Sequence, residues 1–352
     1  MGAPGRVALL SLEPWDGVWR RNQHLAHQLV TQRLVGSLVF VEPPVKLRHK
    51  APQQPELELR TVTPHLVLPR QRGGSALLRA ELRGFTRRVD VLWVNDPVSG
   101  AACLRPGVRA VYDVTDDWRS ADIPDSERAQ LVTAEDVLAK RAQTVVCSQV
   151  LAERWSERYG IRPPVVQNAA DTAAYRDAEP EQLPGLGPHV VYVGTLHRER
   201  LDVRLLVELA QSSAVGQVDL VGPDCLDEVS RETLLAAGVV LHGPVDHTRV
   251  PAIMAGADVL LCPHRVDAFT MSLDAIKAFE YLATDRSVVA TPSSGFQDLS
   301  APGLQVVPAR DYVAAVVHAL RSPARWPGRP TDGGWPARAR RFAELLTGAH
   351  VE

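Results

Sequence analysis

Short runs of β-branched and other apolar residues alternate along the whole sequence with amphipathic stretches of helical length. Gly, Pro, Asp or Asn ends each run, and few runs alternate apolar with polar residues, which is typical of strands buried on both faces. Strands that alternate with helices form a parallel sheet covered by helices on both sides. In the first half the expected strands are Val7–Leu12, Ser37–Val41, Asp90–Val94, Arg109–Asp113, Thr144–Ser148 and Pro164–Gln167. The expected helices are Arg21–Gln32, Ser75–Arg87, Ser126–Lys140 and Gln149–Tyr159.

The same alternation restarts after a turn-rich passage, Asn168–Pro188, which we expect to be an interdomain linker. Beyond it the expected strands are His189–Val193, Gln217–Val221, Val239–His242, Val259–Cys262, Ser287–Ala290 and Gln305–Val307. The expected helices are Leu201–Gln211, Asp227–Ala237, Ser272–Thr284 and Ala309–Leu320. One more amphipathic segment, Ala337–Thr347, is too short to fold alone and must dock on a folded part of the chain.

The 352 residues therefore predict an α/β protein of two doubly wound, Rossmann-like domains. We expect an N-terminal domain at residues 1–167, the linker at 168–188 and a second domain at 189–335. Ligands of open parallel sheets bind at the carboxyl ends of the strands, so we expect the two domains to face a shared cleft. This architecture suits an enzyme or a binding protein and does not choose between them.

Charge and composition exclude several classes of protein. Lys and Arg number 39 against 41 Asp and Glu, a net charge of -2, which indicates no nucleic-acid or membrane-surface partner. The four cysteines lie far apart without a C-x-x-C pair, which fits a reducing compartment and no zinc ribbon. The apolar run Val7–Leu12 is too short for a signal peptide or a membrane span. We expect a cytoplasmic protein with no integral membrane segment.

Several common catalytic motifs are absent from the sequence. There is no phosphate-binding G-x-x-x-x-G-K-[ST] loop, and the G-x-G at Gly185–Gly187 precedes an expected strand instead of following one. H-E-x-x-H, G-x-S-x-G and D-x-D motifs are also missing. Kinase-like, NAD-dependent and metal-dependent chemistry are therefore disfavoured, and we expect neither a metal nor a cofactor.

The most informative segment is the expected helix Ser272–Thr284. Ile276, Phe279 and Ala283 form its core stripe, and Lys277 and Glu280 share a neighbouring face at the edge of that stripe. An edge position can line a cleft. On spacing alone, an ordinary surface Lys–Glu ion pair explains these two residues better.

This segment resembles the P-x-K-x-x-E-Y-L-A-x-G-x-P-V-V signature of GT-B glycosyltransferases of the retaining, family-4-like type. The matching residues are Lys277, Glu280, Tyr281, Leu282, Ala283, Val288 and Val289, while Ala275, Asp285 and Ser287 replace the usual Pro, Gly and Pro. In that family the Glu binds the ribose hydroxyls of a nucleotide-sugar donor, so the resemblance implies this role for Glu280. It also places Lys277 in the donor site.

Other segments follow in the order that the family requires. Residues 189–196 resemble the strand and glycine turn that open the donor domain, which implies that Gly194, Thr195 and Arg200 lie at the donor diphosphate. Residues 241–246 resemble the loop near the base and imply a donor contact at Val245. The family's last helix crosses back to the first domain, and residues 336–352 are expected to do so here.

The first half resembles the acceptor domain of one bacterial branch of the family. Trp15-Asp-Gly-Val-Trp and Arg21-Asn-Gln-His-Leu-Ala resemble its opening, which implies that Gly17 lies near the transferred sugar, although a plain turn explains it equally well. Asp116 and Asp117 end an expected strand, where either could orient or deprotonate an acceptor hydroxyl, or cap the next turn. His24 is a further catalytic candidate, although a half-buried structural histidine is the commoner case. The loop Pro43–Gln71 is expected to recognise the acceptor.

One position departs from the family pattern. Retaining members commonly carry a second Glu eight positions before the ribose-binding one, and Ser272 stands there in this sequence. Either the loop Asp267–Ser272 binds the sugar through backbone and hydroxyl groups, or the site has lost activity.

The sequence thus predicts a metal-independent, retaining glycosyltransferase that transfers a sugar from a nucleotide-diphosphate sugar to a hydroxyl of a small-molecule or glycan acceptor. The alternatives are an inactive GT-B protein that serves as a binding partner, and a nucleotide-sugar epimerase or hydrolase.

Overall fold

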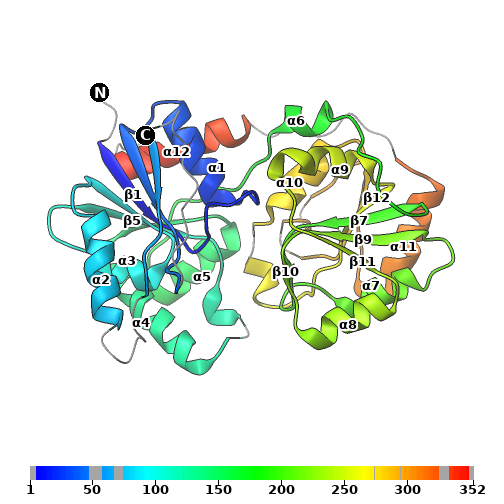
Figure 1. Ribbon diagram of the computed structural model, residues 1–352, viewed down its shortest axis with the longest axis horizontal. Coiled ribbons are helices and arrows are strands. Elements are labelled where there is room, and N and C mark those ends of the chain that lie inside the picture. The colour runs from blue at the N-terminus through cyan, green and yellow to red at the C-terminus, as the bar shows by residue number, and fades with distance from the viewer. Residues whose placement is uncertain are drawn as a thin grey trace. The chain divides into compact units, whose positions relative to one another are not determined.

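The computed structural model describes residues 5–46, 58–66, 74–121, 123–272, 274–293, 295–297, 299–324 and 333–348. The chain divides into two compact units (Figure 1), one formed by Met1–Gln167 with Trp335–Glu352 and the other by Asn168–Gly334. Each unit contains a six-stranded sheet in which all strand pairs are parallel. The predicted α/β class with two doubly wound domains is confirmed.

The sheet of the first unit has the strand order β3-β2-β1-β4-β5-β6. Its strands are β1 (Arg6–Leu10), β2 (Ser37–Val41), β3 (Leu59–Val62), β4 (Val91–Val94), β5 (Arg109–Val114) and β6 (Gln143–Val146). The order reverses between β1 and β4, and such a switch point opens a crevice at the carboxyl ends of the strands.

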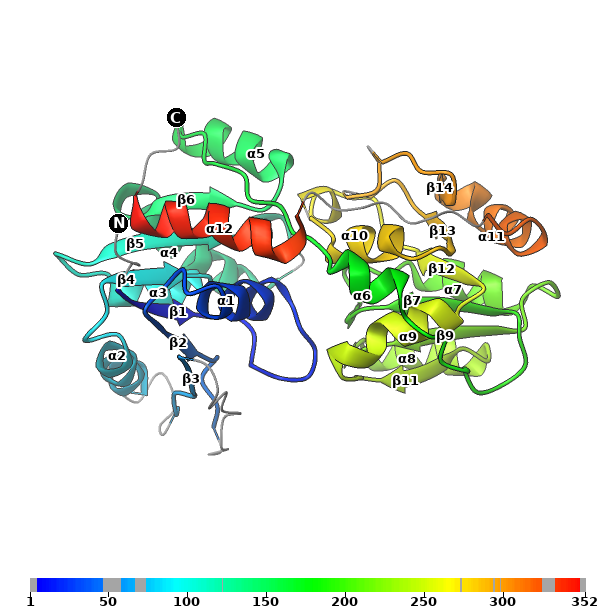
Figure 2. The same cartoon turned by 90° about the horizontal axis from the view of Figure 1, so that it is seen from above.

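Helices cover both faces of this sheet (Figures 1 and 2). On one face lie α1 (Arg21–Thr31) and α12 (Gly334–Thr347), whose Phe342 ring centroid lies 4.7 Å from that of Trp93 in β4. A hydrophobic cluster on the other face joins the sheet to α2, α3, α4 and α5. These four helices span Gly74–Phe85, Pro97–Cys103, Asp125–Arg141 and Gln149–Tyr159.

Two expectations for the first unit were wrong. Part of the loop expected at Pro43–Gln71 forms the edge strand β3, and residues 47–57 and 67–71 of that loop lie outside the described residues. The expected strand Pro164–Gln167 contributes only the isolated bridge between Val165 and Val146. Proline has no N–H to donate to a sheet, so Pro163 and Pro164 prevent a longer strand pairing.

The second unit has the strand order β11-β9-β7-β12-β13-β14. Its strands are β7 (His189–Val193), β9 (Gln217–Val221), β11 (Val240–Gly243), β12 (Val259–Cys262), β13 (Ser287–Ala290) and β14 (Leu304–Val306). A separate pair, β8 (Leu196–His197) and β10 (Asp224–Cys225), lies beyond the ends of β7 and β9 in the chain. The bounds of β7, β9, β12 and β13 are those predicted from the sequence.

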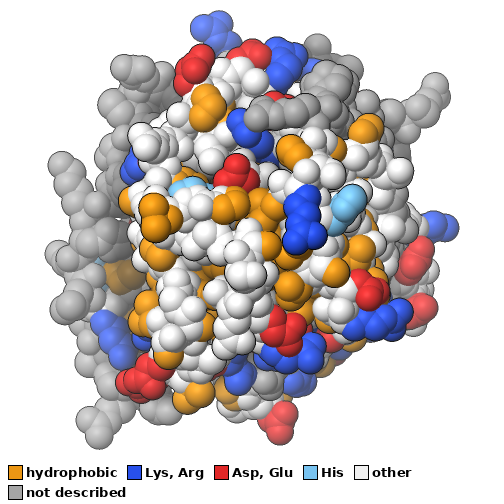
Figure 3. All heavy atoms as spheres, turned by 90° about the vertical axis from the view of Figure 1, so that its right-hand side faces the viewer, with side chains coloured by type: hydrophobic (Ala, Val, Ile, Leu, Met, Phe, Trp, Pro, Cys, Tyr) orange, Lys and Arg blue, Asp and Glu red, His pale blue; other side chains and the backbone are white. Residues whose placement is uncertain are grey.

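Two hydrophobic clusters cover the faces of the second sheet. One includes residues of α7 (Val203–Ala210), α8 (Glu228–Ala236) and α11 (Tyr312–Arg321). The other includes residues of α6 (Thr172–Arg176), α9 (Val250–Gly256) and α10 (Ile276–Ala283). On the face that Figure 3 presents, hydrophobic side chains gather near the middle, with acidic and basic ones around them.

The segment 168–188, expected to be a linker, belongs to the second unit. It contains α6, and its residues Ala170, Tyr175 and Leu183 are buried in the cluster of α6, α9 and α10. These few apolar anchors are enough to fix a turn-rich passage onto the core.

In the part of the chain that the structure describes, no helix is both long and hydrophobic enough to cross a membrane.

Candidate functional site

Two glycines end strands β7 and β9 of the second unit and pack against each other. Gly194 and Gly222 both have φ near +144°, a conformation that residues with a side chain rarely adopt. A Cβ atom on Gly222 would lie 2.2 Å from the carbonyl oxygen of Gly194. Glycine is therefore required here, and Gly194, unlike the buried Gly222, is partly exposed at the carboxyl end of its strand.

Helix α10 is fixed above these strand ends by a buried tyrosine. The Tyr281 hydroxyl accepts a hydrogen bond from the Val193 N–H at 3.0 Å and donates one to the Leu261 carbonyl at 3.1 Å. The helix begins at Ile276 instead of the predicted Ser272, because a 3₁₀ turn (Thr270–Ser272) precedes it. One residue thus ties α10 to both β7 and β12.

Lys277 extends from α10 to the glycine turn. Its Nζ lies 4.8 Å from the centroid of the Tyr192 ring, and 3.0 Å from where a Cβ on Gly194 would be. Burial disfavours the ammonium, but the Tyr192 side chain favours it, and the net pKa of Lys277 lies above its usual value. Lys277 is therefore a positive charge held against the Gly194 backbone.

Other basic residues surround the same turn. His264, which follows β12, is buried, and its Nε2 lies 3.3 Å from the Tyr192 hydroxyl. Burial, followed by the positive charges of Lys277, Arg200 and His197, holds the pKa of His264 well below its usual value. The guanidinium of Arg200 lies 5.5 Å from the Phe269 ring centroid. The site therefore concentrates positive charge around a neutral histidine.

Glu280 lies one turn further along α10. Its Oε1 accepts a hydrogen bond from the Tyr175 hydroxyl at 2.7 Å. Burial raises the pKa of Glu280 above the usual value, although Tyr175 and Lys277 both act to lower it. Among the described residues no ion pair joins Lys277 to Glu280, so the surface-pair interpretation of these residues was wrong.

Ser272 lies in a tightly hydrogen-bonded loop before α10. It is buried, and its hydroxyl donates to the Phe269 carbonyl at 2.7 Å. The Asp267 carboxylate accepts from the Thr270 N–H at 2.8 Å, while the Asp267 N–H donates to the Thr270 hydroxyl at 3.0 Å. Asp274, just beyond, is held by the backbone N–H and the side-chain amide of Asn168.

The remaining donor-site candidates also lie at the ends of strands in the second unit. The Thr195 carbonyl accepts hydrogen bonds from the Tyr192 hydroxyl at 3.3 Å and the His197 N–H at 3.1 Å. Val245 follows β11 and packs partly buried against the core cluster of α6, α9 and α10. All the predicted donor residues except Gly17 thus belong to the second unit.

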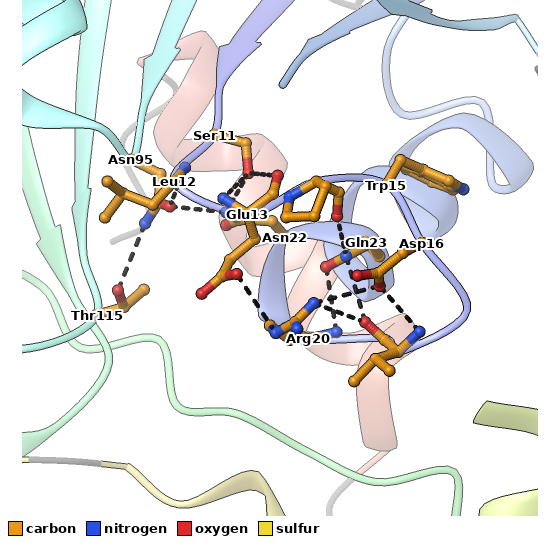
Figure 4. Close-up of polar contacts among 12 residues, drawn as sticks. Ser11, Leu12, Glu13, Trp15, Asp16, Arg20, Asn22, Gln23, Asn95 and Thr115 are labelled. Carbon is orange, nitrogen blue, oxygen red and sulfur yellow. Dashed lines mark hydrogen bonds and ion pairs between the residues drawn. The ribbon is translucent and has the colours of Figure 1, made fainter. Parts of the chain in front are cut away.

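In the first unit, Gly17 lies in the loop between β1 and α1. Figure 4 shows polar contacts of this loop, among them those of Asp16 and Arg20. The Asn95 Oδ1 anchors the start of this loop by accepting from the Leu12 N–H at 3.2 Å and the Asn22 amide at 2.7 Å. The Asp16 carboxylate accepts from the Val18 N–H at 2.9 Å and pairs with Arg20 at 3.3 Å. Gly17 is exposed at the tip of this Asx turn.

Asp116 and Asp117 follow β5 and have different surroundings. Asp117 is buried, and its carboxylate accepts from Arg154 at 2.9 Å and lies 3.5 Å from Arg158. Asp116 is half-buried and accepts from the Thr115 hydroxyl at 3.2 Å. Ion pairing with two arginines favours a structural role for Asp117.

His24 on α1 packs between aromatic rings. It stacks on Trp335 of the chain's last helix, with ring centroids 4.6 Å apart and planes within 6° of parallel. It also makes an edge contact with Trp19 at 5.2 Å. These contacts favour the structural explanation of His24.

Sequence reasoning missed several residues of the second-unit site, above all Tyr175, Tyr192, Asn168 and His264. Each acts through a contact with a residue distant in sequence, and only His264 carried a local signal, as a histidine directly after a predicted strand and Pro263.

Among the described residues, no group of three or more His, Cys, Asp or Glu side chains is placed to hold a metal ion.

Comparison with known proteins finds a family model that matches most of the second unit. Residues 187–322 match the family model described as "Glycosyl transferases group 1". TuaH of Bacillus subtilis (strain 168), whose name assigns it to teichuronic acid biosynthesis as a glycosyltransferase, is 24% identical over 201 residues. That match covers 52% of this chain and 50% of TuaH, so the chain spans about half the length of this relative.

Solved structures share the architecture of the whole chain. The sucrose-phosphate synthase tll1590 from Thermosynechococcus elongatus has a TM-score of 0.70 at 17% identity, covering 97% of this chain and 94% of that one. Anabaena Alr3699/HepE, in complex with UDP and glucose, has a TM-score of 0.65 at 15% identity, covering 97% and 95%. At these identities the likeness shows the fold, and it confirms the predicted GT-B architecture.

Proposed function

We propose that the protein is a glycosyltransferase that transfers a sugar from a nucleotide-diphosphate sugar to an acceptor hydroxyl. The observation that carries this proposal is the placement of Lys277 and Glu280 on α10, above the Gly194 turn and within the residues that match the glycosyltransferase family model. One positive charge and one carboxylate, a turn apart, suit the diphosphate and the ribose of one ligand.

The diphosphate would bind at the glycine turn. Lys277 and Arg200 offer charged donors, and without a Cβ on Gly194 the phosphate oxygens can approach the backbone there and at Thr195. These cations stabilise negative charge on the leaving diphosphate, which is the main electrostatic requirement of the reaction. The proposal therefore includes a reaction that needs neither a metal nor a cofactor.

Glu280 would bind the ribose diol. A carboxylate can accept from both hydroxyls, and the bond from Tyr175 to Oε1 fixes its orientation. Val245 would lie near the base, and the Ser272 loop would meet the sugar through backbone groups, because the Ser272 hydroxyl already donates to Phe269.

On the acceptor side, Asp116 is the candidate that we retain to orient the acceptor hydroxyl or take its proton. Asp117 and His24 have structural contacts that fit this role less well. Gly17 would bring the backbone of its loop close to the transferred sugar. We propose retention of configuration, following the sequence resemblance.

The comparisons suggest which substrates to test first. Structures of Alr3699/HepE contain UDP and UDP-glucose, so UDP-sugars are the first donors. The assignment of TuaH to teichuronic acid biosynthesis favours a cell-surface glycan as the acceptor. We place the reaction in the cytoplasm, which fits the four free cysteines.

Thermal unfolding with UDP, GDP, dTDP, ADP and NAD tests the donor site. A ligand at about 100 times its Kd adds roughly 2.7 kcal/mol of stability, a readily measured rise in Tm. We expect one nucleoside diphosphate to raise the Tm of the wild type and of Lys140→Met, a matched change at an exposed position of α4, but not of Lys277→Met. Equal shifts in Lys277→Met and the wild type would exclude this site.

Turnover separates the enzyme from its alternatives. We expect UDP release from a UDP-sugar to require an acceptor, to persist in EDTA, and to give a product whose anomeric configuration by NMR is that of the donor. Binding of UDP without turnover would favour an inactive binding partner, and recovery of an epimerised nucleotide sugar would favour the epimerase.

A further inference from the structure

The first unit carries a groove of about 610 Å³ between α2, α3 and α4. Arg79 and Arg83 of α2 and Arg141 at the end of α4 line it, together with small and apolar residues that include Ala101, Val98 and Val137. We call it the arginine groove. It belongs to the helices that cover the sheet on the side opposite α1 and α12 (Figure 1), and no residue of the proposed glycosyltransferase site lines it.

The three arginines of the groove have no acidic partner. Arg79 and Arg83 lie four residues apart and therefore on one side of α2. Within the described ranges, the side chains of Arg79, Arg83 and Arg141 make no hydrogen bond and no ion pair. The buried Arg21, in contrast, forms a bidentate pair with Asp113. Three unpaired guanidinium groups around one groove attract an anion.

The overall charge of the chain conceals a strong asymmetry between its units. The first unit has 26 Lys and Arg against 20 Asp and Glu, a net charge of +6, and the second has 13 against 21, a net charge of -8. The net charge of -2 therefore argues against an anionic partner for the whole chain but not for its first unit.

Between the arginines, the walls of the groove are mostly apolar, with Gln130 and Thr133 as the polar exceptions. Val98 is 41% exposed, and alanines of α3 and α4 line the groove beside it. Along α4 the groove runs from Ala129 to Arg141, about 18 Å at the rise of an α-helix. A surface that combines unpaired arginines with exposed apolar residues suits lipid, in which phosphates and acyl chains lie next to each other.

We propose that the arginine groove docks the protein on an anionic phospholipid bilayer. The guanidinium groups of Arg79, Arg83 and Arg141 pair with lipid phosphates, and Val98 and the alanines contact the adjacent acyl region. A soluble phosphate would use the arginines alone and gain nothing from the apolar walls. Docking does not depend on the proposed transferase reaction.

Vesicle co-sedimentation tests this proposal with the full-length chain. The vesicles contain phosphatidylcholine alone or with 40% phosphatidylglycerol, in about 0.1 M salt. The test variant is Arg79→Ala/Arg83→Ala/Arg141→Ala. The matched control, Arg204→Ala/Arg310→Ala/Arg321→Ala, removes three exposed arginines from the second unit. Val98→Asp tests the apolar wall, and an unchanged Tm shows that each variant is folded.

We expect the wild type to bind the anionic vesicles and not the neutral ones. Each basic residue at an anionic surface raises the affinity about fivefold. The affinity of the triple groove variant for anionic vesicles should therefore fall on the order of 100-fold, and that of the control variant much less. Val98→Asp should also weaken binding. The proposal is overturned if the control loses as much as the groove variant, if neutral vesicles bind equally well, or if Val98→Asp has no effect. It also fails if millimolar glycerol phosphate displaces the vesicles, because the groove would then be a site for a free anion.

Discussion

At the scale of single residues, the proposed donor site depends on charges held in unusual surroundings. Lys277 is stabilised as a cation by the Tyr192 ring, whereas Glu280 is half-buried beside Tyr175 and its carboxylate gains less from its neighbours than desolvation costs it. A raised carboxylate pKa means that the fold favours the protonated form. The protonated Glu280 carboxyl group therefore stabilises the fold at acid pH, and this stabilisation is lost as the pH rises through the pKa of the folded state.

Glu280→Gln should therefore stabilise the ligand-free protein and weaken the binding of the nucleotide-sugar donor. Glutamine keeps an oxygen for the Tyr175 hydroxyl and removes the buried charge. We expect a Tm about 2 °C higher at pH 7.5 and a much smaller shift with UDP, both measured by calorimetry. Glu208→Gln, at an exposed position of α7, is the control and should change neither quantity. A lower Tm in Glu280→Gln would show that the charge stabilises the fold.

The pH dependence of donor affinity should follow the same carboxylate. Protonated Glu280 is a poorer acceptor for the ribose diol, so the affinity for UDP-glucose should fall on acidification at a pH above the ordinary glutamate value of 4.5. Tyr175→Phe removes a hydrogen bond that lowers this pKa, and should move the loss of affinity to higher pH. Titration calorimetry at several pH values measures the shift. The same pH profile in Glu280→Gln as in the wild type would assign it to another group.

The residue types of the site could be predicted from the sequence, but not all of their roles. Lys277 and Glu280 stand in a recognisable pattern, whereas the bond of Glu280 to Tyr175 joins residues 105 positions apart. For the same reason the sequence did not distinguish Asp117 from Asp116, and it kept His24 as a catalytic candidate although a structural histidine is the commoner case. Their partners Arg154 and Trp335 are brought to them only by the folded chain.

At the scale of the elements, strands buried on both faces were the most predictable feature. The runs of β7, β9, β12 and β13 are rich in β-branched and other apolar residues and are followed by turn residues, so their bounds follow from composition although β9 has the buried Asp219 in its middle. The edge strand β3 has an exposed arginine in its middle. This residue interrupts the apolar pattern, so the strand was not predicted from the sequence. The start of α10 was missed because Ser272 has the chemistry of an N-cap but directs its hydroxyl to Phe269.

Tyr281→Phe should loosen the attachment of α10 to the sheet. The substitution leaves the Val193 N–H and the Leu261 carbonyl buried without their partner, and each such group costs about 1–3 kcal/mol. We expect a loss of about 2–4 kcal/mol in the stability of the second unit, measured by urea unfolding. Tyr312→Phe is the matched control, since its buried hydroxyl donates to the single carbonyl of Val289 and should cost less. Equal losses in the two variants would mean that Tyr281 has no special role in holding the helix.

At the scale of the whole molecule, the chain returns to its first unit after completing the second. Helix α12 packs against β4 and α1 through Phe342 and Trp335, and the Arg340 guanidinium donates to the Gln32 side chain at 2.9 Å. The first unit is therefore discontinuous in sequence, whereas the second is a continuous segment with its own sheet and core. The periodicity of the last segment predicts a helix, and only the folded chain shows that it covers Trp93.

This connectivity predicts that the two units can be destabilised separately. Phe342→Ala removes a fully buried ring from the first unit and should lower its stability by about 3–5 kcal/mol. Because the residues proposed to bind the nucleoside diphosphate lie in the second unit, UDP should still raise the Tm of the second unit's transition by the wild-type amount. Phe296→Ala removes a side chain from the core of the second unit. It should lower the Tm of the second unit's transition, the one that UDP raises, and leave that of the first unit unchanged. Scanning calorimetry with and without UDP distinguishes the transitions. A single transition that both substitutions lower equally, with the UDP response intact in each, would show that the two units unfold as one.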